Sequence, residues 1–229
     1  MALDIYVMPL WRFKVGDFRS PIETNLAFRP KIVTPDGIVE RPVKVSFFAK
    51  WKAKKQVRLI RKVVERLNQK RLVWTDEGEI VFNQQGRFFE ALRAYARWLD
   101  CREVMPQFVI PEDGDYYKHP VLECGIERPT CPHLIEHDCY SGYYLPCDFD
   151  LVAEVEPYQL HDNWSFSKPV GSSVRLIREL EYVQSELTVP DDYLFSDDDP
   201  LSPVKTAYLQ LREAAKLSCR HGLPIIFWG

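Results

Sequence analysis

The densest group of potentially reactive side chains falls within residues 131–147, which hold three of the six cysteines and two of the five histidines. The thiol and imidazole side chains that could coordinate zinc are Cys131, His133, His137 and Cys139. If Pro132 begins a short helix, His133 and His137 lie four residues apart on one face. The segment lacks the C-x-x-C pair with which structural zinc sites usually begin. We therefore favour buried thiols and hydrogen-bonded histidines, with zinc as the alternative cofactor.

His133, Glu136 and His137 also form the pattern H-x-x-E-H. This pattern resembles the motif of the inverted zincin metallopeptidases, in which two histidines bind zinc and the glutamate activates water. The resemblance covers five residues and implies a metal-dependent hydrolase. That family places its motif in a long helix with a further acidic ligand downstream, whereas here prolines precede the motif and a glycine follows closely. Glu186 or Glu213 could supply the missing ligand, and the sequence does not select between them.

A longer pattern begins at the same histidine and reads HLIxHDxxxGYYLPxDF, followed by VGSS and an amphipathic segment. It resembles a pattern in uncharacterised bacterial proteins to which no activity is attached. The resemblance rests on histidines, acids and tyrosines rather than on cysteines. It implies a ligand or partner pocket formed by His133, His137, Asp138, Tyr143, Tyr144 and Asp148. The alternative is a structural corner in which Asp138 and the histidines bind backbone groups of a loop.

A basic helix is predicted ahead of this region. Residues 44–71 carry eleven basic side chains and one acidic side chain, and apolar residues recur at the helical period from Phe47 to Leu72. The cations predicted on one side of this helix are Lys54, Lys55, Arg58, Arg61, Lys62 and Arg66. With Trp51 near its start, the segment 50–71 could bind nucleic-acid phosphates or lie on an anionic membrane. A pI near 6.0 argues against a dedicated nucleic-acid binder, and the acidic second half offers an internal partner.

Charge is segregated along the chain, although the formal net charge is only −3. Residues 1–110 hold 21 basic and 12 acidic side chains, whereas residues 111–229 hold 9 and 21. The first part is thus basic and helix-rich, and the second is acidic and loop-rich. Within the second part, residues 191–199 form an acidic connector with Tyr193, Leu194 and Phe195 at its centre. We expect a solvated loop there whose aromatic centre could meet a basic partner.

The sequence lacks the usual signatures of several function classes. The ten glycines never stand two, four or five residues apart, so no G-x-G dinucleotide turn, G-x-S-x-G elbow or P-loop exists. The amino-terminal segment lacks the features of a signal peptide, and no stretch approaches the length of a membrane span. We therefore expect a cytoplasmic protein whose cysteines are thiols or metal ligands.

The elements that must position these residues follow from periodicity and turn signals. The segments 3–10 and 223–228 both indicate strands, which we expect in one sheet, where they could be neighbours. Two hairpins are predicted, one from residues 31–34 and 38–45 and one from Trp74 and residues 79–82. The longer helices are predicted at residues 47–72, 87–103, 173–187 and 202–220. Residues 105–170 carry eight prolines, which indicates loops and short strands, with residues 142–146 the best strand.

These observations predict a single α+β domain over residues 1–229, with a mixed or antiparallel sheet that includes both termini, about four longer helices and a proline-rich insertion. Our first functional hypothesis is a non-catalytic, bacterial-type protein that binds another protein, as toxin-neutralising immunity proteins do. The alternatives are a zinc protein, structural or hydrolytic, that uses His133 and His137, and a nucleic-acid binder that uses the basic helix. The sequence identifies no catalytic residue and no oligomeric state.

Overall fold

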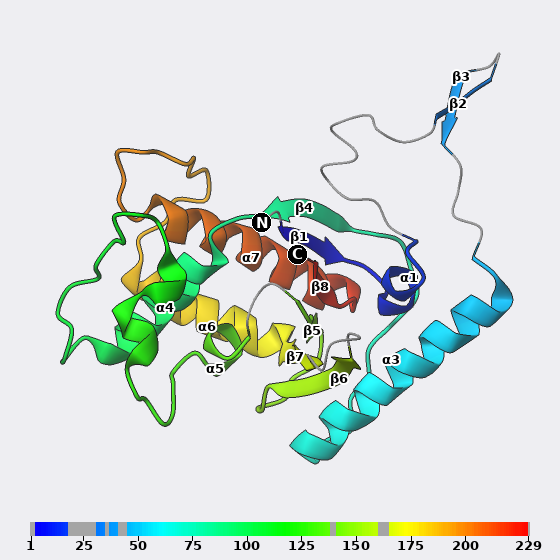
Figure 1. The fold of residues 1–229 in the computed structure, drawn as a ribbon, viewed down its shortest axis with the longest axis horizontal. Coiled ribbons are helices and arrows are strands. Elements are labelled where there is room, and N and C mark those ends of the chain that lie inside the picture. The colour runs from blue at the N-terminus through cyan, green and yellow to red at the C-terminus, as the bar shows by residue number, and fades with distance from the viewer. Residues whose placement is uncertain are drawn as a thin grey trace.

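The computed structural model describes residues 3–17, 31–34, 37–40, 45–137, 141–159 and 165–228 (Figure 1). The helices are α1 (Leu10–Lys14), α3 (Phe47–Asn68), α4 (Phe89–Cys101), α5 (Pro132–Ile135), α6 (Ser173–Glu186) and α7 (Ser202–His221), with short 3-10 helices η1 (Tyr116–Lys118) and η2 (Pro120–Glu123). The strands are β1 (Leu3–Val7), β2 (Lys31–Thr34), β3 (Gly37–Glu40), β4 (Phe82–Gly86), β5 (Tyr143–Leu145), β6 (Ala153–Gln159), β7 (Ser165–Ser172) and β8 (Ile225–Trp228).

One six-stranded sheet organises the fold, in the order β4-β1-β8-β5-β7-β6. The two terminal strands are direct neighbours, since β1 pairs antiparallel with β8 and Asp4 lies opposite Trp228. β5 pairs parallel with β7, and the other pairs in this sheet are antiparallel. The prediction of an α+β fold with a mixed sheet that contains both termini is therefore confirmed. β2 and β3 form a separate antiparallel hairpin, as predicted.

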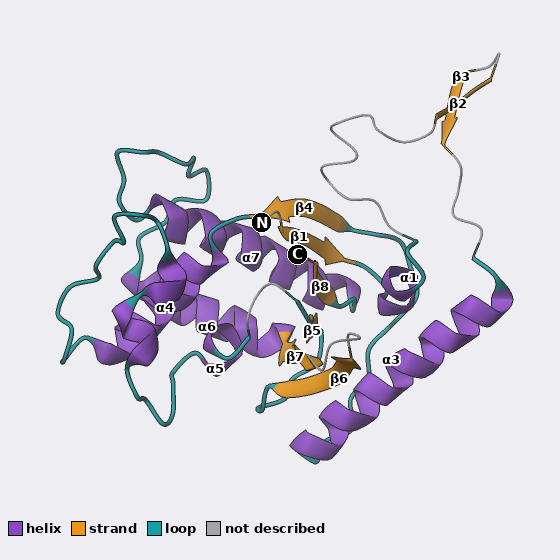
Figure 2. Ribbon diagram, in the orientation of Figure 1, coloured by secondary structure: helices purple, strands orange, loops and turns teal. Residues whose placement is uncertain are grey.

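The sheet separates two apolar cores because successive residues of a strand point to opposite faces. Leu3, Ile5 and Val7 of β1 pack in one core with α4, α6 and α7. Tyr6 packs in the other core with the buried side of α3. Figure 2 shows α4, α6 and α7 gathered at one end of the molecule and α3 along the opposite edge. No helix in the described part of the chain is long and apolar enough to cross a bilayer.

The starts and ends of the long helices follow local chemistry. The hydroxyl of Ser46 accepts a hydrogen bond from the backbone N–H of Ala49 at the start of α3, and Ser172 does the same for Arg175 at the start of α6. α7 ends at His221 and is followed by Gly222, which has a left-handed backbone with φ of 65°. At the start of α7 the cap position is Leu201, and the hydroxyl of Ser202 accepts hydrogen bonds from the Tyr193 hydroxyl and the backbone N–H of Ser196.

The predicted hairpin of Trp74 with residues 79–82 is wrong. β4 begins at Phe82 and pairs with β1, at the edge of the main sheet. The local turn instead serves a long-range contact, because the Asp76 carboxylate accepts a hydrogen bond of 2.6 Å from the backbone N–H of Leu10. Trp74 is buried in the core beneath α3. The hairpin does not form because Trp74 is buried in this core and because residues from Phe82 onward pair with the open edge of β1.

Gly142 offers a test of how tightly the centre of the sheet is packed. Its φ is +92°, and a Cβ placed there would collide with the carbonyl oxygen of Pro169. We expect Gly142→Ala to lower the free energy of unfolding by about 2–4 kcal/mol, through backbone strain and overpacking. Urea unfolding measures this change. Gly125→Ala is the control, since nothing lies within 4 Å of a Cβ there, and an equal loss in both variants would contradict the prediction.

Candidate functional site

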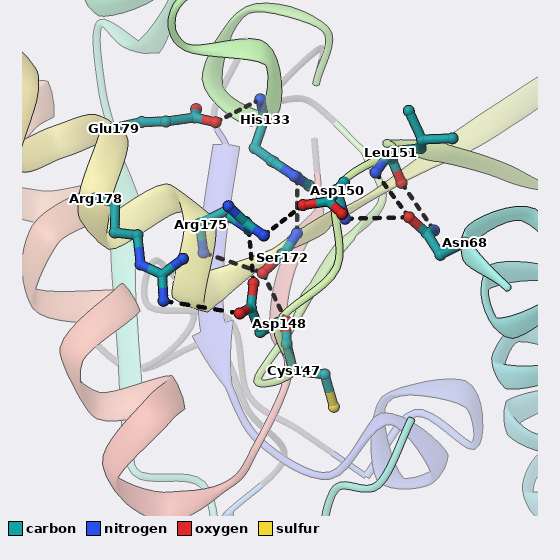
Figure 3. A network of polar contacts seen from close by, with 10 residues as sticks. All are labelled: Asn68, His133, Cys147, Asp148, Asp150, Leu151, Ser172, Arg175, Arg178 and Glu179. Carbon is teal, nitrogen blue, oxygen red and sulfur yellow. Dashed lines mark hydrogen bonds and ion pairs between the residues drawn. The ribbon is translucent and has the colours of Figure 1, made fainter. Parts of the chain in front are cut away.

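Six polar residues from three segments converge at the junction of β7 and α6, and we call this group the polar corner (Figure 3). Its members are His133, Asp148, Asp150, Ser172, Arg175 and Glu179. His133 belongs to α5, and Ser172, Arg175 and Glu179 belong to the end of β7 and to α6. The two aspartates lie on the loop that follows β5. His133, Ser172 and Glu179 are buried, with exposed fractions of 1%, 0% and 7%.

His133 is fixed by contacts on both its backbone and its ring. Its Nδ1 accepts a hydrogen bond of 3.0 Å from the backbone N–H of Ser172, so in this arrangement the neutral ring carries its proton on Nε2. Its carbonyl oxygen accepts a hydrogen bond from the Tyr144 hydroxyl. Burial lowers the pKa of His133 to about 4. The imidazole is therefore neutral at physiological pH, and its Nδ1 lone pair is already engaged.

The Glu179 side chain binds backbone groups of the short helix α5. Its two carboxylate oxygens accept hydrogen bonds from the backbone N–H groups of His133 and Leu134, at 3.0 and 2.8 Å. Burial nevertheless raises the pKa of Glu179 to about 7, because desolvation outweighs these two hydrogen bonds. This carboxylate was missed by sequence reasoning. The available signal was its place among the apolar residues Leu176, Leu180 and Val183 on the buried side of α6.

Arg175 links the carboxylates of the polar corner. Its Nε lies 2.6 Å from Asp148, and its Nη2 pairs with Asp150. Arg178 reaches Asp148 only at 3.7 Å. A cavity of about 460 Å³ opens beside these groups, lined by Thr130, Pro132, His133, Asp150, Arg175, Arg178, Glu179 and Tyr182. Both signs of charge line it, so the cavity itself favours no single class of ligand.

The residues predicted to form one pocket are only partly together. His133 and Asp148 both belong to the polar corner, but the adjacent tyrosines face opposite sides of the sheet, with Tyr144 in the core of α6 and Tyr143 in the core of α3. His137 stacks on Tyr144 at 4.2 Å between ring centroids, and its Nε2 lies 3.3 Å from the Tyr143 carbonyl oxygen. Of the predicted pocket residues that the structure describes, only His133 lines the cavity.

The described residues do not provide a set of ligands for the predicted zinc site. Cys131 is buried and its thiol lies 3.8 Å from the Glu179 carbonyl oxygen. Asp138 and Cys139 lie outside the described residues. Within the part of the chain that the structure describes, no three His, Cys, Asp or Glu side chains are placed to hold a metal ion. Zinc binding that involves Cys139 remains a prediction.

The acidic connector lies at the opposite end of the molecule from α3, where it joins α6 to α7 (Figure 1). Residues 187–201 contain five aspartates and no Lys or Arg. Asp192, Asp197 and Asp198 are exposed and form no ion pair with any described residue. At the centre of this loop, Leu194 and Phe195 are exposed by 81% and 49%.

The connector is held in one conformation by its other side chains. Asp199 accepts hydrogen bonds from the Tyr193 hydroxyl and the Lys205 ammonium group, both at 2.7 Å. Asp191 pairs with Arg212 of α7, and Phe195 stacks on Phe88 at 5.5 Å. The pKa values of Asp191 and Asp199 are lowered, chiefly by the hydrogen bonds from Arg212 and Lys205. The loop therefore presents its remaining carboxylates from a preorganised backbone.

A second acidic segment packs on the same helical core. Residues 102–131 follow α4, and Tyr116 and Val121 from this segment share that core with Val189 of the connector. The exposed carboxylates of the segment are Glu103, Glu112, Asp113, Glu123 and Glu127. We call these side chains, together with Asp192, Asp197 and Asp198, the acidic end of the molecule.

Residues 1–227 match a family described as "Putative DNA-mimic protein". The chain belongs to this family. No curated protein and no solved structure matches the chain.

The predicted cations of the basic helix α3 in this DNA-mimic family member fall into two groups, those that contact the rest of the protein and those that are exposed. Lys54 pairs with Glu77, and its ammonium group lies 5.8 Å from the Trp11 ring centroid. Arg61 lies 4.0 Å from the Trp74 ring centroid. The other four predicted cations are exposed, and they are Lys55, Arg58, Lys62 and Arg66. The predicted basic face is therefore narrower than the sequence indicated, since two of its members contact the body of the protein.

Glu179 makes the stability of this family member depend on pH. A carboxyl with a pKa near 7 in the folded state and near 4.5 in the unfolded state stabilises the fold at low pH, and that contribution is lost as pH rises through 7. We expect Glu179→Gln to remove this dependence. The difference in free energy of unfolding between wild type and variant then falls by up to about 3 kcal/mol between pH 4.5 and pH 8.

Urea unfolding at several pH values measures this difference. Glu181→Gln, at an exposed position of the same helix, is the matched control and should leave the profile unchanged. A wild-type profile parallel to that of Glu179→Gln would show that Glu179 is ionised throughout the range.

Proposed function

We propose that this protein binds a DNA-binding protein and occupies the surface on which that partner holds nucleic acid. The family description supports a DNA-mimic role, and the observation that carries it here is the acidic end. Its exposed carboxylates offer the negative charge that a nucleic-acid-binding surface meets on phosphates. Cationic side chains that release counterions on binding phosphates respond in the same way to a dense array of carboxylates.

The structure of the connector suits this role. Tyr193, Asp199 and Ser202 hold its backbone by hydrogen bonds within the loop, so little conformational entropy remains to be lost on binding. Leu194 and Phe195, exposed by 81% and 49%, offer apolar contact among the carboxylates. A phosphate backbone lacks such side chains, so these two residues give the complex a protein-specific contribution.

This proposal retains the protein-binding part of the hypothesis drawn from the sequence. The family description gives no support to the narrower version, an immunity-like protein that neutralises a toxin. In this proposal the polar corner lies outside the binding surface and fixes the positions of α5 and α6. The acidic end, rather than the histidine pattern, is then the functional surface.

Three substitutions test the proposal. We expect the triple variant Asp192→Asn, Asp197→Asn and Asp198→Asn to bind its partner about tenfold or more weakly, because it removes three carboxylates that face the partner's cations. The immobilised full chain is used to capture proteins from a cell extract, and a short DNA duplex is then added as the eluent. The expected result is a captured DNA-binding protein that the duplex releases and the triple variant does not retain.

The matched control replaces three exposed carboxylates elsewhere, Glu77→Gln, Glu79→Gln and Glu154→Gln, and should retain the partner. Wild-type binding should also weaken steeply between about 50 mM and about 200 mM salt. Captured proteins that the duplex leaves in place, or that the triple variant retains equally well, would contradict the proposal.

A further inference from the structure

α3 presents an outward surface that is exposed within the part of the chain that the structure describes. Its inner side is buried in the core, where Ala53, Val57, Ile60 and Val64 are at most 3% exposed. Its outward side carries the exposed cations Lys55, Arg58, Lys62 and Arg66, none of which forms an ion pair with a described residue. The helix extends over 22 residues along the outer edge of the molecule (Figure 1).

Large apolar side chains interleave with these cations. Phe48 is 79% exposed and Trp51 is 57% exposed near the start of the helix. Leu59, Val63 and Leu67, exposed by 54%, 45% and 45%, recur every four residues and form a ridge. Arg58, Lys62 and Arg66 have the same spacing one position earlier, so an apolar ridge and a cationic ridge run side by side along the helix.

We propose that the outward surface of α3 docks on an anionic lipid bilayer. Anionic headgroups neutralise the cationic ridge, and the aromatic and aliphatic side chains enter the boundary between headgroups and acyl chains. Long basic side chains reach the headgroups while their methylene stems remain in apolar surroundings. This surface thus matches the charge and the polarity of one partner at the same time.

Two other partners, a nucleic acid and a second copy of α3, would match only part of this surface. Nucleic-acid phosphates would pair with the cations but would leave Leu59, Val63 and Leu67 in water. A second copy of α3 would cover the apolar ridge but would oppose like charges along its whole length. The acidic end lies at the far side of the molecule from α3, where its carboxylates do not oppose an approaching anionic membrane (Figure 1). This site is separate from the acidic end and does not rest on the function proposed above.

Vesicle cosedimentation of the full chain tests the proposal. The vesicles contain phosphatidylcholine alone or phosphatidylcholine with about 30% phosphatidylserine, at low and at high salt. We expect binding to the anionic vesicles, little binding to the neutral ones, and loss of binding at high salt. The triple variant Arg58→Glu, Lys62→Glu and Arg66→Glu should reduce partitioning at least about tenfold. Its matched control, Arg128→Glu, Lys216→Glu and Arg220→Glu, makes the same change in charge at exposed positions elsewhere and should bind like wild type.

A second pair of variants separates a membrane from a nucleic acid. Phe48→Ser with Leu59→Ser, exposed by 79% and 54%, should weaken vesicle binding about tenfold, whereas Val104→Ser with Val109→Ser, exposed by 82% and 54% elsewhere, should not. Circular dichroism confirms that each variant is folded. The proposal is overturned if wild type fails to bind anionic vesicles. It is equally overturned if wild type binds a DNA duplex more tightly than vesicles and this binding depends on the cations but not on Phe48 and Leu59.

Discussion

The antiparallel pairing of β1 with β8 is the contact on which the remaining architecture depends. It joins the first and last described segments of the chain at the centre of the sheet, with Tyr6 opposite Ile226. β4 reaches the sheet only through β1, and β5 reaches this pair only through β8. Because this pair lies between the two cores, the helices on each face of the sheet pack against its side chains.

This central sheet also explains how a chain with a small net charge can present two surfaces of opposite sign. The acidic loops attach to the helices on one face of the sheet, and α3 packs on the other. In the part of the chain that the structure describes, the acidic half forms no ion pair with the basic helix, although the sequence offered it as an internal partner. Within the described residues, the recorded ion pair of α3 joins Lys54 to Glu77, and both belong to the basic half. The remaining cations and carboxylates therefore stay available on separate surfaces.

The polar corner shows that a motif read from sequence can indicate where polar groups converge without indicating which groups they contact. The histidine pattern does mark a region of convergent polar groups. His133, however, is a neutral imidazole with Nδ1 engaged by Ser172, and its neighbour Glu179 is occupied by backbone N–H groups. The pattern H-x-x-E-H suggested Glu136 as the acid, yet the carboxylate that reaches His133 comes from α6, 46 residues away. Spacing along the chain cannot reveal such a partner.

The sequence by itself determined the local elements, because helical periodicity, serine caps and proline or glycine breaks act within a few residues. It also determined that both termini are strands and that charge is segregated. Only the tertiary structure decided that β4 joins β1, that Tyr143 and Tyr144 serve different cores, and that Lys54 and Arg61 are withdrawn from the basic face. These outcomes depend on contacts between distant segments, whose energies come from burial of particular side chains rather than from any pattern along the chain.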